Sequence, residues 1–139
     1  MGNMALLIAT DDWGKIDVFR QFLTTQSRAV WRTKGKYTPE YLSQIPFPIN
    51  LYFFHRNIVK FRAKCSGIYR GTKENWPLTD SPPEYRSSTT PYTLFIVINE
   101  IHKVNETHIS DFPRWENPKI SYNNGQLGIL KVIDIFERR

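Results

Sequence analysis

The sequence has little cysteine and no long apolar run. A single cysteine, Cys65, stands among 139 residues, so no disulfide can form within the chain, and a reducing cytoplasm is the expected compartment. No stretch approaches the roughly 18 apolar residues that a membrane-spanning helix needs. The opening MGNMALLIATDDWG has no basic region and no small-residue cleavage pattern, so it is expected to form a strand and not a signal peptide.

Motifs of established catalytic chemistry are also missing. The sequence has no Walker loop, no nucleophile elbow and no dinucleotide fingerprint. Its histidines, His55, His102 and His108, do not stand at ligand spacing with one another or with Cys65, so neither a metal nor another cofactor is expected. The acid pair at positions 11 and 12 is compatible with a general base, but helix capping is the favoured role. The sequence therefore favours a binding module over an enzyme.

Acidic residues are scarce in one part of the chain. The net charge is +6, and ten of the 19 cations lie between Arg28 and Lys73, where Glu40 is the single acid. The rest of the chain carries nine cations against twelve acids. Such clustering is typical of a protein that binds a polyanion, whereas a basic surface that serves only solubility is the plain alternative. With 40% hydrophobic residues, the chain is expected to form one domain over residues 1–139.

Three segments carry helix signals. Asp11 and Asp12 form an N-cap cluster, and apolar residues then recur at helical spacing through Leu23, which predicts a helix after Asp12 with Phe19 on its buried face and Lys15 on its outward face. Thr38 before Pro39 predicts a brief second helix around residues 40–44. The three-residue steps in QLGILKVIDIFERR predict a terminal helix lying on a sheet.

The remaining apolar runs predict strands. They are MALLIA, RAVWR, INLYFFH, NIVKFRAKCSGIYR and YTLFIVINEI, with a tight turn at residues 56 and 57 between the third and the fourth. In the fourth, alternation places Lys60, Arg62 and Lys64 on a solvent-facing side, opposite a core face that holds Phe61, Cys65 and Tyr69. The expected fold class is α+β, a strongly curved mixed sheet or small barrel with two to three flanking helices.

The residues 72–91, TKENWPLTDSPPEYRSSTTP, are rich in turn formers and predict a long functional loop that holds Trp76. Trp31, at the end of the second predicted strand, could simply fill the core beside Phe53 and Phe61. Trp13 is expected to pack the helix start against the sheet, and the role of Trp115 stays open.

The order of these pieces resembles the EVE and YTH families of PUA-like domains. LLIATDDWGKI followed by AVWR is similar to their first strand, helix and second strand, and KFRAKCSGIY is similar to their strand that ends in GI or GV. PYTLFIVINEIHKV with ISDFPRWENPKIS resembles their long fifth strand and the segment after it. The resemblance runs from about Leu6 to Ser121 and rests on short, moderately specific motifs.

The resemblance implies a site for a modified base. In YTH domains, two tryptophans at the places of Trp31 and Trp76 form walls of an aromatic cage around the methylamino group of N6-methyladenine, and Asp12 matches the residue that contacts the base edge. Tyr85 or Tyr69 is the expected third wall. Arg32 departs from the family, which has a small polar residue there, and adds a phosphate partner. The full expected set of phosphate-binding residues is Arg32, Lys34, Lys36, Lys60, Arg62, Lys64, Arg70 and Lys73.

The expected function is therefore a nucleic-acid-binding module that turns a base out of its stack. DNA is favoured over RNA, because related prokaryotic domains serve as N-terminal targeting modules of McrB-type restriction proteins, with a fused AAA+ GTPase and a nuclease partner subunit. The C-terminal FERR is compatible with a domain excised from such a protein. The alternatives are an RNA reader and a small PUA-like enzyme that acts on a nucleotide with Asp11 or Asp12 and a lysine. A protein-interaction module is a further alternative, and it would show no salt-dependent binding of oligonucleotides.

Overall fold

A computed structural model describes residues 2–33, 37–71, 78–85, 94–123 and 128–137. The expected helix after the N-cap forms as α1 (Trp13–Phe22), and the side chain of Asp12 accepts a hydrogen bond from the backbone N of Lys15, 2.9 Å away. Ile16 and Phe19 are the buried residues of this helix. The second helix, α2 (Pro39–Ser43), begins as predicted after Thr38, whose hydroxyl accepts from the backbone N of Tyr41.

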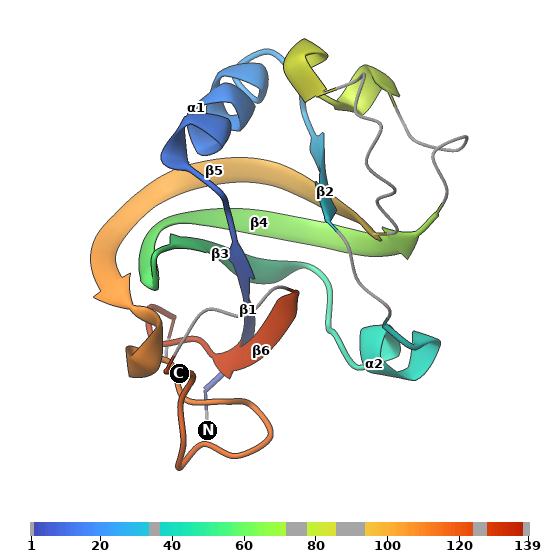
Figure 1. Cartoon of the computed structure of the whole chain (residues 1–139). Coiled ribbons are helices and arrows are strands. Elements are labelled where there is room, and N and C mark those ends of the chain that lie inside the picture. The colour runs from blue at the N-terminus through green and yellow to red at the C-terminus, as the bar shows by residue number, and fades with distance from the viewer. Residues whose placement is uncertain (1, 34–36, 72–77, 86–93, 124–127, 138–139) are drawn as a thin grey trace.

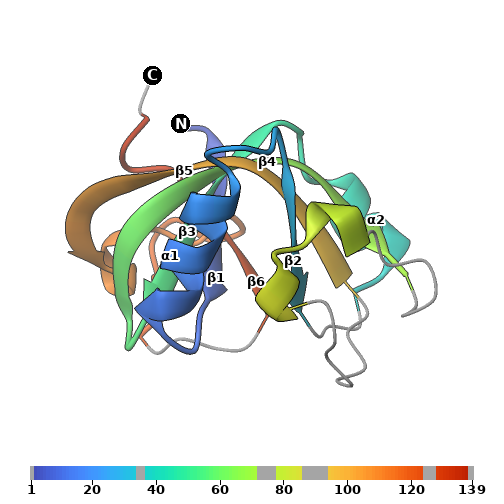
Figure 2. The ribbon, with the colours of Figure 1, turned by 90° about the horizontal axis from the view of Figure 1, so that it is seen from above.

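The six strands form one mixed sheet in the order β2-β5-β4-β3-β1-β6. They are β1 (Met4–Ala9), β2 (Ala29–Thr33), β3 (Ile49–His55), β4 (Ile58–Arg70), β5 (Leu94–His108) and β6 (Ile129–Ile133). Among the strands of the described residues, β1 and β3 alone pair in parallel. Because β2 and β6 lie at opposite ends of this order, the sheet is open and does not close into the small barrel that was one of the two predictions. The long β4 and β5 curve strongly beneath α1 (Figures 1 and 2).

The prediction of a terminal helix was wrong. Residues 129–133 form β6, which pairs antiparallel with β1 from Ile8↔Ile129 to Met4↔Ile133. Gly128 adopts φ +116 just before it, a conformation that does not start a helix. The run ILKVI is buried on both faces of a strand, and Lys131 anchors it to α2 by donating to Tyr41 O and Gln44 Oε1, each at 3.0 Å. A strand with two buried faces and a buried helix have the same apolar composition, so spacing could not separate them.

Strands β3 and β4 form the predicted hairpin. Arg56 and Asn57 have positive φ values of 51° and 66°, as a tight two-residue turn requires. Three register shifts interrupt the pairing of β4 with β5, at 59/61, 63/65 and 65/67. The predicted alternation holds from Phe61 to Cys65 and then changes, so that Ile68 joins the core and Tyr69 is exposed.

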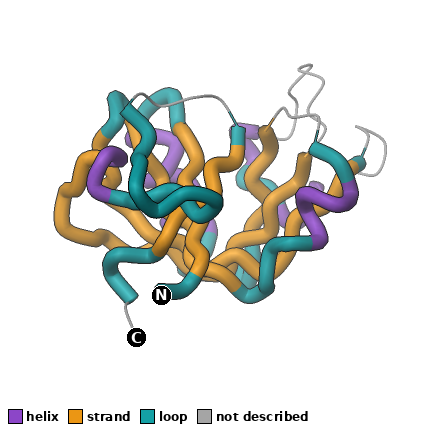
Figure 3. Tube along the Cα trace, turned by 90° about the horizontal axis from the view of Figure 1, so that it is seen from below, coloured by secondary structure: helices purple, strands orange, loops and turns teal. Residues whose placement is uncertain are grey.

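The sheet has two faces with separate cores. The face that we call the helix face carries α1 and α2, and its core includes Trp31, Phe53 and Cys65. The opposite face, which we call the loop face, is covered by the chain after β5, including η4 (Ile109–Asp111), and its core includes Tyr52 and Phe112. Figure 3 shows the strands as a curved layer. The two ends of the described chain meet, since Asp134 N donates to Asn3 O at 2.8 Å.

Candidate functional site

Trp31 is buried on the helix face, with 2% of its surface exposed. Its ring packs against Phe53 and Phe19, with ring centres 4.7 and 4.9 Å away. The partner of Trp31 across β5 is Ile96, and Ile96 in turn pairs with Ile68 on β4, so all three side chains point to the same core. Trp31 therefore occupies the core position that the sequence offered as the alternative to an open cage wall.

The amine of Lys15 covers the Trp31 ring. Its Nζ lies 3.9 Å from the centre of that ring and 5.3 Å from the centre of the Tyr85 ring. Lys15 is held there by its place in the first turn of α1, directly after the Asp12 cap. A cation between two aromatic rings is a cation–π arrangement, worth about 0.5 to 2 kcal/mol depending on how much water is excluded.

The environment of Lys15 disfavours its charge. Burial is the main cause that lowers the pKa of Lys15 from its ordinary 10.5 to about 8; the charge of Arg32 acts in the same direction, and the carboxylates of Asp11 and Asp12 act in the opposite direction. A lysine whose pKa lies near neutral pH can serve as a general base or exchange its proton with a ligand, which an ordinary surface lysine does not do.

Tyr85 completes this group of residues. It ends the short helix η3 (Pro83–Tyr85), and its ring centre lies 5.7 Å from that of Phe19. Burial raises the pKa of its hydroxyl, and the charges of Asp12 and Glu84 add to that effect. The guanidinium of Arg32 donates to the carbonyl oxygen of Tyr85 and ties η3 to strand β2. We call Lys15, Trp31, Arg32 and Tyr85, together with Asp12, the Trp31 cluster.

The Trp31 cluster unites some of the predicted residues and not others. Asp12, Trp31, Arg32 and Tyr85 come together from the α1 cap, β2 and η3. Trp76 lies outside the described residues, as do the predicted phosphate contacts Lys34, Lys36 and Lys73. Tyr69 lies on the loop face, where it is 59% exposed, so it does not line the Trp31 cluster.

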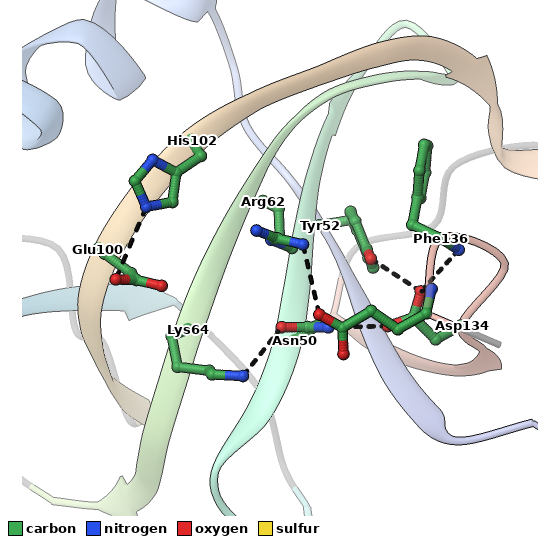
Figure 4. A network of polar contacts seen from close by, with 9 residues as sticks. Asn50, Tyr52, Arg62, Lys64, Glu100, His102, Asp134 and Phe136 are labelled. Carbon is green, nitrogen blue, oxygen red and sulfur yellow. Dashed lines mark hydrogen bonds and ion pairs between the residues drawn. The ribbon is translucent and has the colours of Figure 1, made fainter. Parts of the chain in front are cut away.

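Two of the predicted phosphate contacts, Arg62 and Lys64, also lie on the loop face (Figure 4). Arg62 Nη1 is 3.4 Å from Glu137 Oε1, and Lys64 Nζ is 3.4 Å from Asn50 Oδ1. Both border a buried network around Asp134, whose carboxylate accepts from Tyr52 Oη at 2.8 Å and from Asn50 Nδ2 at 2.9 Å. These two cations therefore lie on the opposite side of the sheet from Trp31.

The cation Lys60 stands nearer to α1. It lies at the first irregularity of β4, its Nζ is 5.4 Å from the centre of the Trp13 ring, and it forms an ion pair with Glu106 at 3.1 Å. Trp13 packs on Phe61 and His55, the structural role expected for it. Arg70, at the end of β4, is exposed. Acids distant in sequence thus neutralise part of the basic segment, an effect that a count along the chain cannot reveal.

Lys15 is the member of this neighbourhood that sequence reasoning missed. Lys15 had been assigned to the outward face of the helix, as its charge implied. One signal could have identified Lys15: it stands three residues after the N-cap, in the first turn of the helix, which meets the sheet. Phe19 was correctly predicted as core, and its contact with Tyr85 needed the fold of residues 78–85.

Other chemistry finds little support among the described residues. They hold no group of three His, Cys, Asp or Glu side chains that could bind a metal ion. Cys65 is fully buried, and burial raises its pKa to about 12, so its thiol stays protonated and inert. No helix in the described part of the chain is long and apolar enough to cross a membrane.

Comparison of this chain with protein-family models, with curated proteins and with solved structures found no match.

Proposed function

We propose that this domain reads a modified base in a nucleic acid, with methylated DNA, and N6-methyladenine in particular, as the favoured ligand. The base would be turned out of its stack and would lie between Trp31 and Tyr85, in the place that the Lys15 amine occupies in the free protein. The proposal keeps the resemblance to EVE and YTH domains, and with it a role in targeting a restriction system.

The observation that carries the proposal is the desolvated lysine between two aromatic rings. The Lys15 amine is close to both Trp31 and Tyr85, and burial lowers its pKa to about 8. A half-buried cation held mainly by ring faces is stabilised less than one that binds a phosphate directly. A ligand that offers a flat ring to Trp31 and Tyr85 and a phosphate to Lys15 would therefore replace this arrangement with a more stable one.

The energies of this exchange are of similar size. Stacking of a base on an aromatic side chain is worth roughly 1 to 3 kcal/mol, and the lysine contact that it replaces is worth about 0.5 to 2 kcal/mol. Turning the base out of a duplex costs a few kcal/mol more. The released Lys15 can offset that cost by binding a flanking phosphate, as can Lys60 beside the start of α1.

Asp12 supplies the polar part of base recognition. It is exposed at the start of α1, one turn from Lys15, and its charge acts on the Tyr85 hydroxyl. A carboxylate accepts a hydrogen bond from the exocyclic amine of adenine, and this amine keeps one N–H after methylation. The methyl group adds apolar contact with the rings and weakens base pairing, which favours extrusion of the modified base.

A second candidate function, catalysis on a nucleotide, rests on the same lysine. A lysine with a pKa of about 8, adjacent to Asp11 and Asp12, has the proton affinity of a general base. A domain with this activity would convert a nucleoside or nucleotide, and the conversion would stop in Lys15→Met while binding persisted. An RNA reader is the third candidate, and a titration with RNA separates it from the first.

The test is a fluorescence-anisotropy titration of short DNA and RNA duplexes that carry N6-methyladenine, 5-methylcytosine or no modification. We expect N6-methylated DNA to bind most tightly, and Tyr85→Ala to remove about 1 to 3 kcal/mol of that affinity. Tyr122→Ala is the matched control, because Tyr122 is also half-buried beneath a cation, with Arg114 4.1 Å from its ring centre. Equal binding of modified and plain duplexes, unchanged in Tyr85→Ala, would refute the proposed function.

A further inference from the structure

Tyr69 is the most exposed large apolar side chain in the described part of the chain. It is 59% exposed, against 45% for Ile120 and 37% for Phe47. It stands near the end of β4 on the loop face, on the opposite side of the sheet from the ring of Trp31. An aromatic ring on a strand with most of its surface in water is a common feature of surfaces that bind unpaired bases.

The ring of Tyr69 is supported from below. A Cβ atom at Gly67 would lie 3.0 Å from Tyr69 Oη and 3.2 Å from Cζ, closer than such atoms normally approach. Residues two positions apart on a strand share a face, so the ring rests on the backbone of Gly67 because that residue has no side chain. The ring is thus held low on the sheet before any ligand arrives, which reduces the entropy that binding would cost.

Positive charge lies beside the ring. Arg28, Arg70 and Tyr69 border a hollow of about 290 Å³ whose floor is formed by Val30, Phe95 and Val97. Arg28 contacts Asp80 through Nε at 2.9 Å, and its side chain is still 57% exposed. Two arginines against one carboxylate leave this hollow with a positive balance, which complements a phosphate backbone.

We propose that Tyr69, Arg28 and Arg70, which we call the Tyr69 platform, bind an unpaired nucleotide that neighbours the base held at Trp31. This inference rests on the proposed function and adds a single-stranded segment to its ligand. The base of that nucleotide stacks on Tyr69, and the two arginines bind its flanking phosphates. Stacking of this kind is indifferent to methylation, so the platform contributes affinity and not selectivity.

The fold connects the platform with the Trp31 cluster across the edge strand β2. Tyr69 pairs with Phe95, and Phe95 pairs with Arg32, so the three side chains share a row on the loop face. The Arg32 guanidinium then reaches the carbonyl of Tyr85, whose ring packs with Phe19 on the helix face. Asp80 and Tyr85 belong to one short segment, residues 78–85, which contacts both sites. A strand of nucleic acid that follows this edge would meet the two sites in succession.

The experiment compares plain and N6-methylated single-stranded DNA on the whole domain by anisotropy. We expect Tyr69→Ala to weaken both by about 5- to 100-fold, and Tyr69→Phe to bind nearly as wild type does, because the ring is kept. Gly67→Ala should weaken both to a smaller extent than Tyr69→Ala, since the added Cβ shifts the ring by a few tenths of an ångström and removes no group that contacts the ligand. Ile120→Ala, another exposed apolar residue, should change neither affinity.

The outcomes separate the two proposals. Unchanged affinity in Tyr69→Ala and Gly67→Ala, with a methyl preference that is lost in Tyr85→Ala, overturns the platform and leaves the proposed function standing. Weakened binding in Tyr69→Ala, with no methyl preference in any variant, supports the platform and overturns the base reader. Absence of salt-dependent binding to any oligonucleotide overturns both.

Discussion

The Nζ of Lys15 lies 3.9 Å from the centre of the Trp31 ring, on the helix face of the sheet. This contact joins the first turn of α1 to the edge strand β2, and it covers the ring that we propose as a wall of the base-binding site. It also makes Lys15 the residue whose ionisation and movement are most informative about function.

The first prediction concerns pH and stability. The pKa of Lys15 is about 8 in the folded chain and 10.5 for a free lysine, so above pH 8 the unfolded state binds more protons than the folded state. Burial of this cation therefore costs stability below pH 8, and the cost falls as pH rises toward 10.5. We expect the free energy of unfolding of wild type, relative to Lys15→Met, to rise by about 2 kcal/mol between about pH 7 and about pH 9.5. Urea denaturation of both proteins at each pH measures it, and a constant difference would contradict a buried amine.

The second prediction concerns Trp31 as a core residue. Trp31→Ala should lower the free energy of unfolding by about 3 to 5 kcal/mol, because it leaves a cavity between Phe19 and Phe53. Trp31→Phe keeps a ring and should cost less. A loss below about 1 kcal/mol for the alanine variant would show that Trp31 is not packed as described. A loss of binding in Trp31→Ala can be interpreted only after the loss of folded protein has been subtracted. Tyr85 is therefore the better residue for the binding test.

The third prediction concerns the ion pair of Lys60 with Glu106, 3.1 Å apart. Lys60→Ala should weaken binding to all nucleic acid sequences alike and make its salt dependence shallower, because one phosphate contact is lost. Glu106→Gln should do the reverse, since it frees Lys60 from its competitor. The measurement is the slope of log affinity against log salt concentration. If Glu106→Gln leaves both affinity and slope unchanged, Lys60 does not contact the nucleic acid.

The fourth prediction concerns the buried carboxylate of Asp134, which is 1% exposed. It accepts hydrogen bonds from Tyr52 Oη, from Asn50 Nδ2 and from the backbone N atoms of Phe136 and Glu137. Asp134→Ala leaves buried donors unpaired and should cost about 2 to 4 kcal/mol of stability. Tyr52→Phe removes one of these bonds and should cost about 1 kcal/mol. Thermal unfolding of both variants checks the order, and an equal loss in the two would contradict Asp134 as the centre of the network.

Local signals in the sequence predicted much of this fold. The Asp12 cap, the Thr38 cap and the turn at Arg56–Asn57 are each determined by a few neighbouring residues, and all three formed as expected. The end of the chain was mispredicted because β6 exists only through its pairing with β1, which lies more than a hundred residues away. The irregularities of β4 were equally hidden, and they moved Tyr69 from the expected core face to the surface.

The candidate site was predictable only in part. The resemblance selected Asp12, Trp31 and Tyr85, which the fold brings together with Arg32, and it offered Tyr69 as the alternative wall, which lies on the other face. Strand alternation grouped Lys60, Arg62 and Lys64, of which the last two face away from Trp31. Partners from other elements, such as Glu106 and Glu137, decide which cations remain available. Such pairings depend on tertiary structure and leave no trace in sequence spacing.

The most direct test of the account is NMR of the Lys15 side chain during titration with an N6-methylated DNA strand. In the free domain, the ε-methylene of Lys15 should show an upfield ring-current shift from Trp31, and its amine should titrate with a pKa of about 8. When a base takes the place of this amine, we expect the ring-current shift to disappear and the pKa to rise toward the ordinary 10.5 or above, as the amine meets phosphate and water. A Lys15 signal and pKa that stay unchanged at saturating methylated DNA would contradict the account.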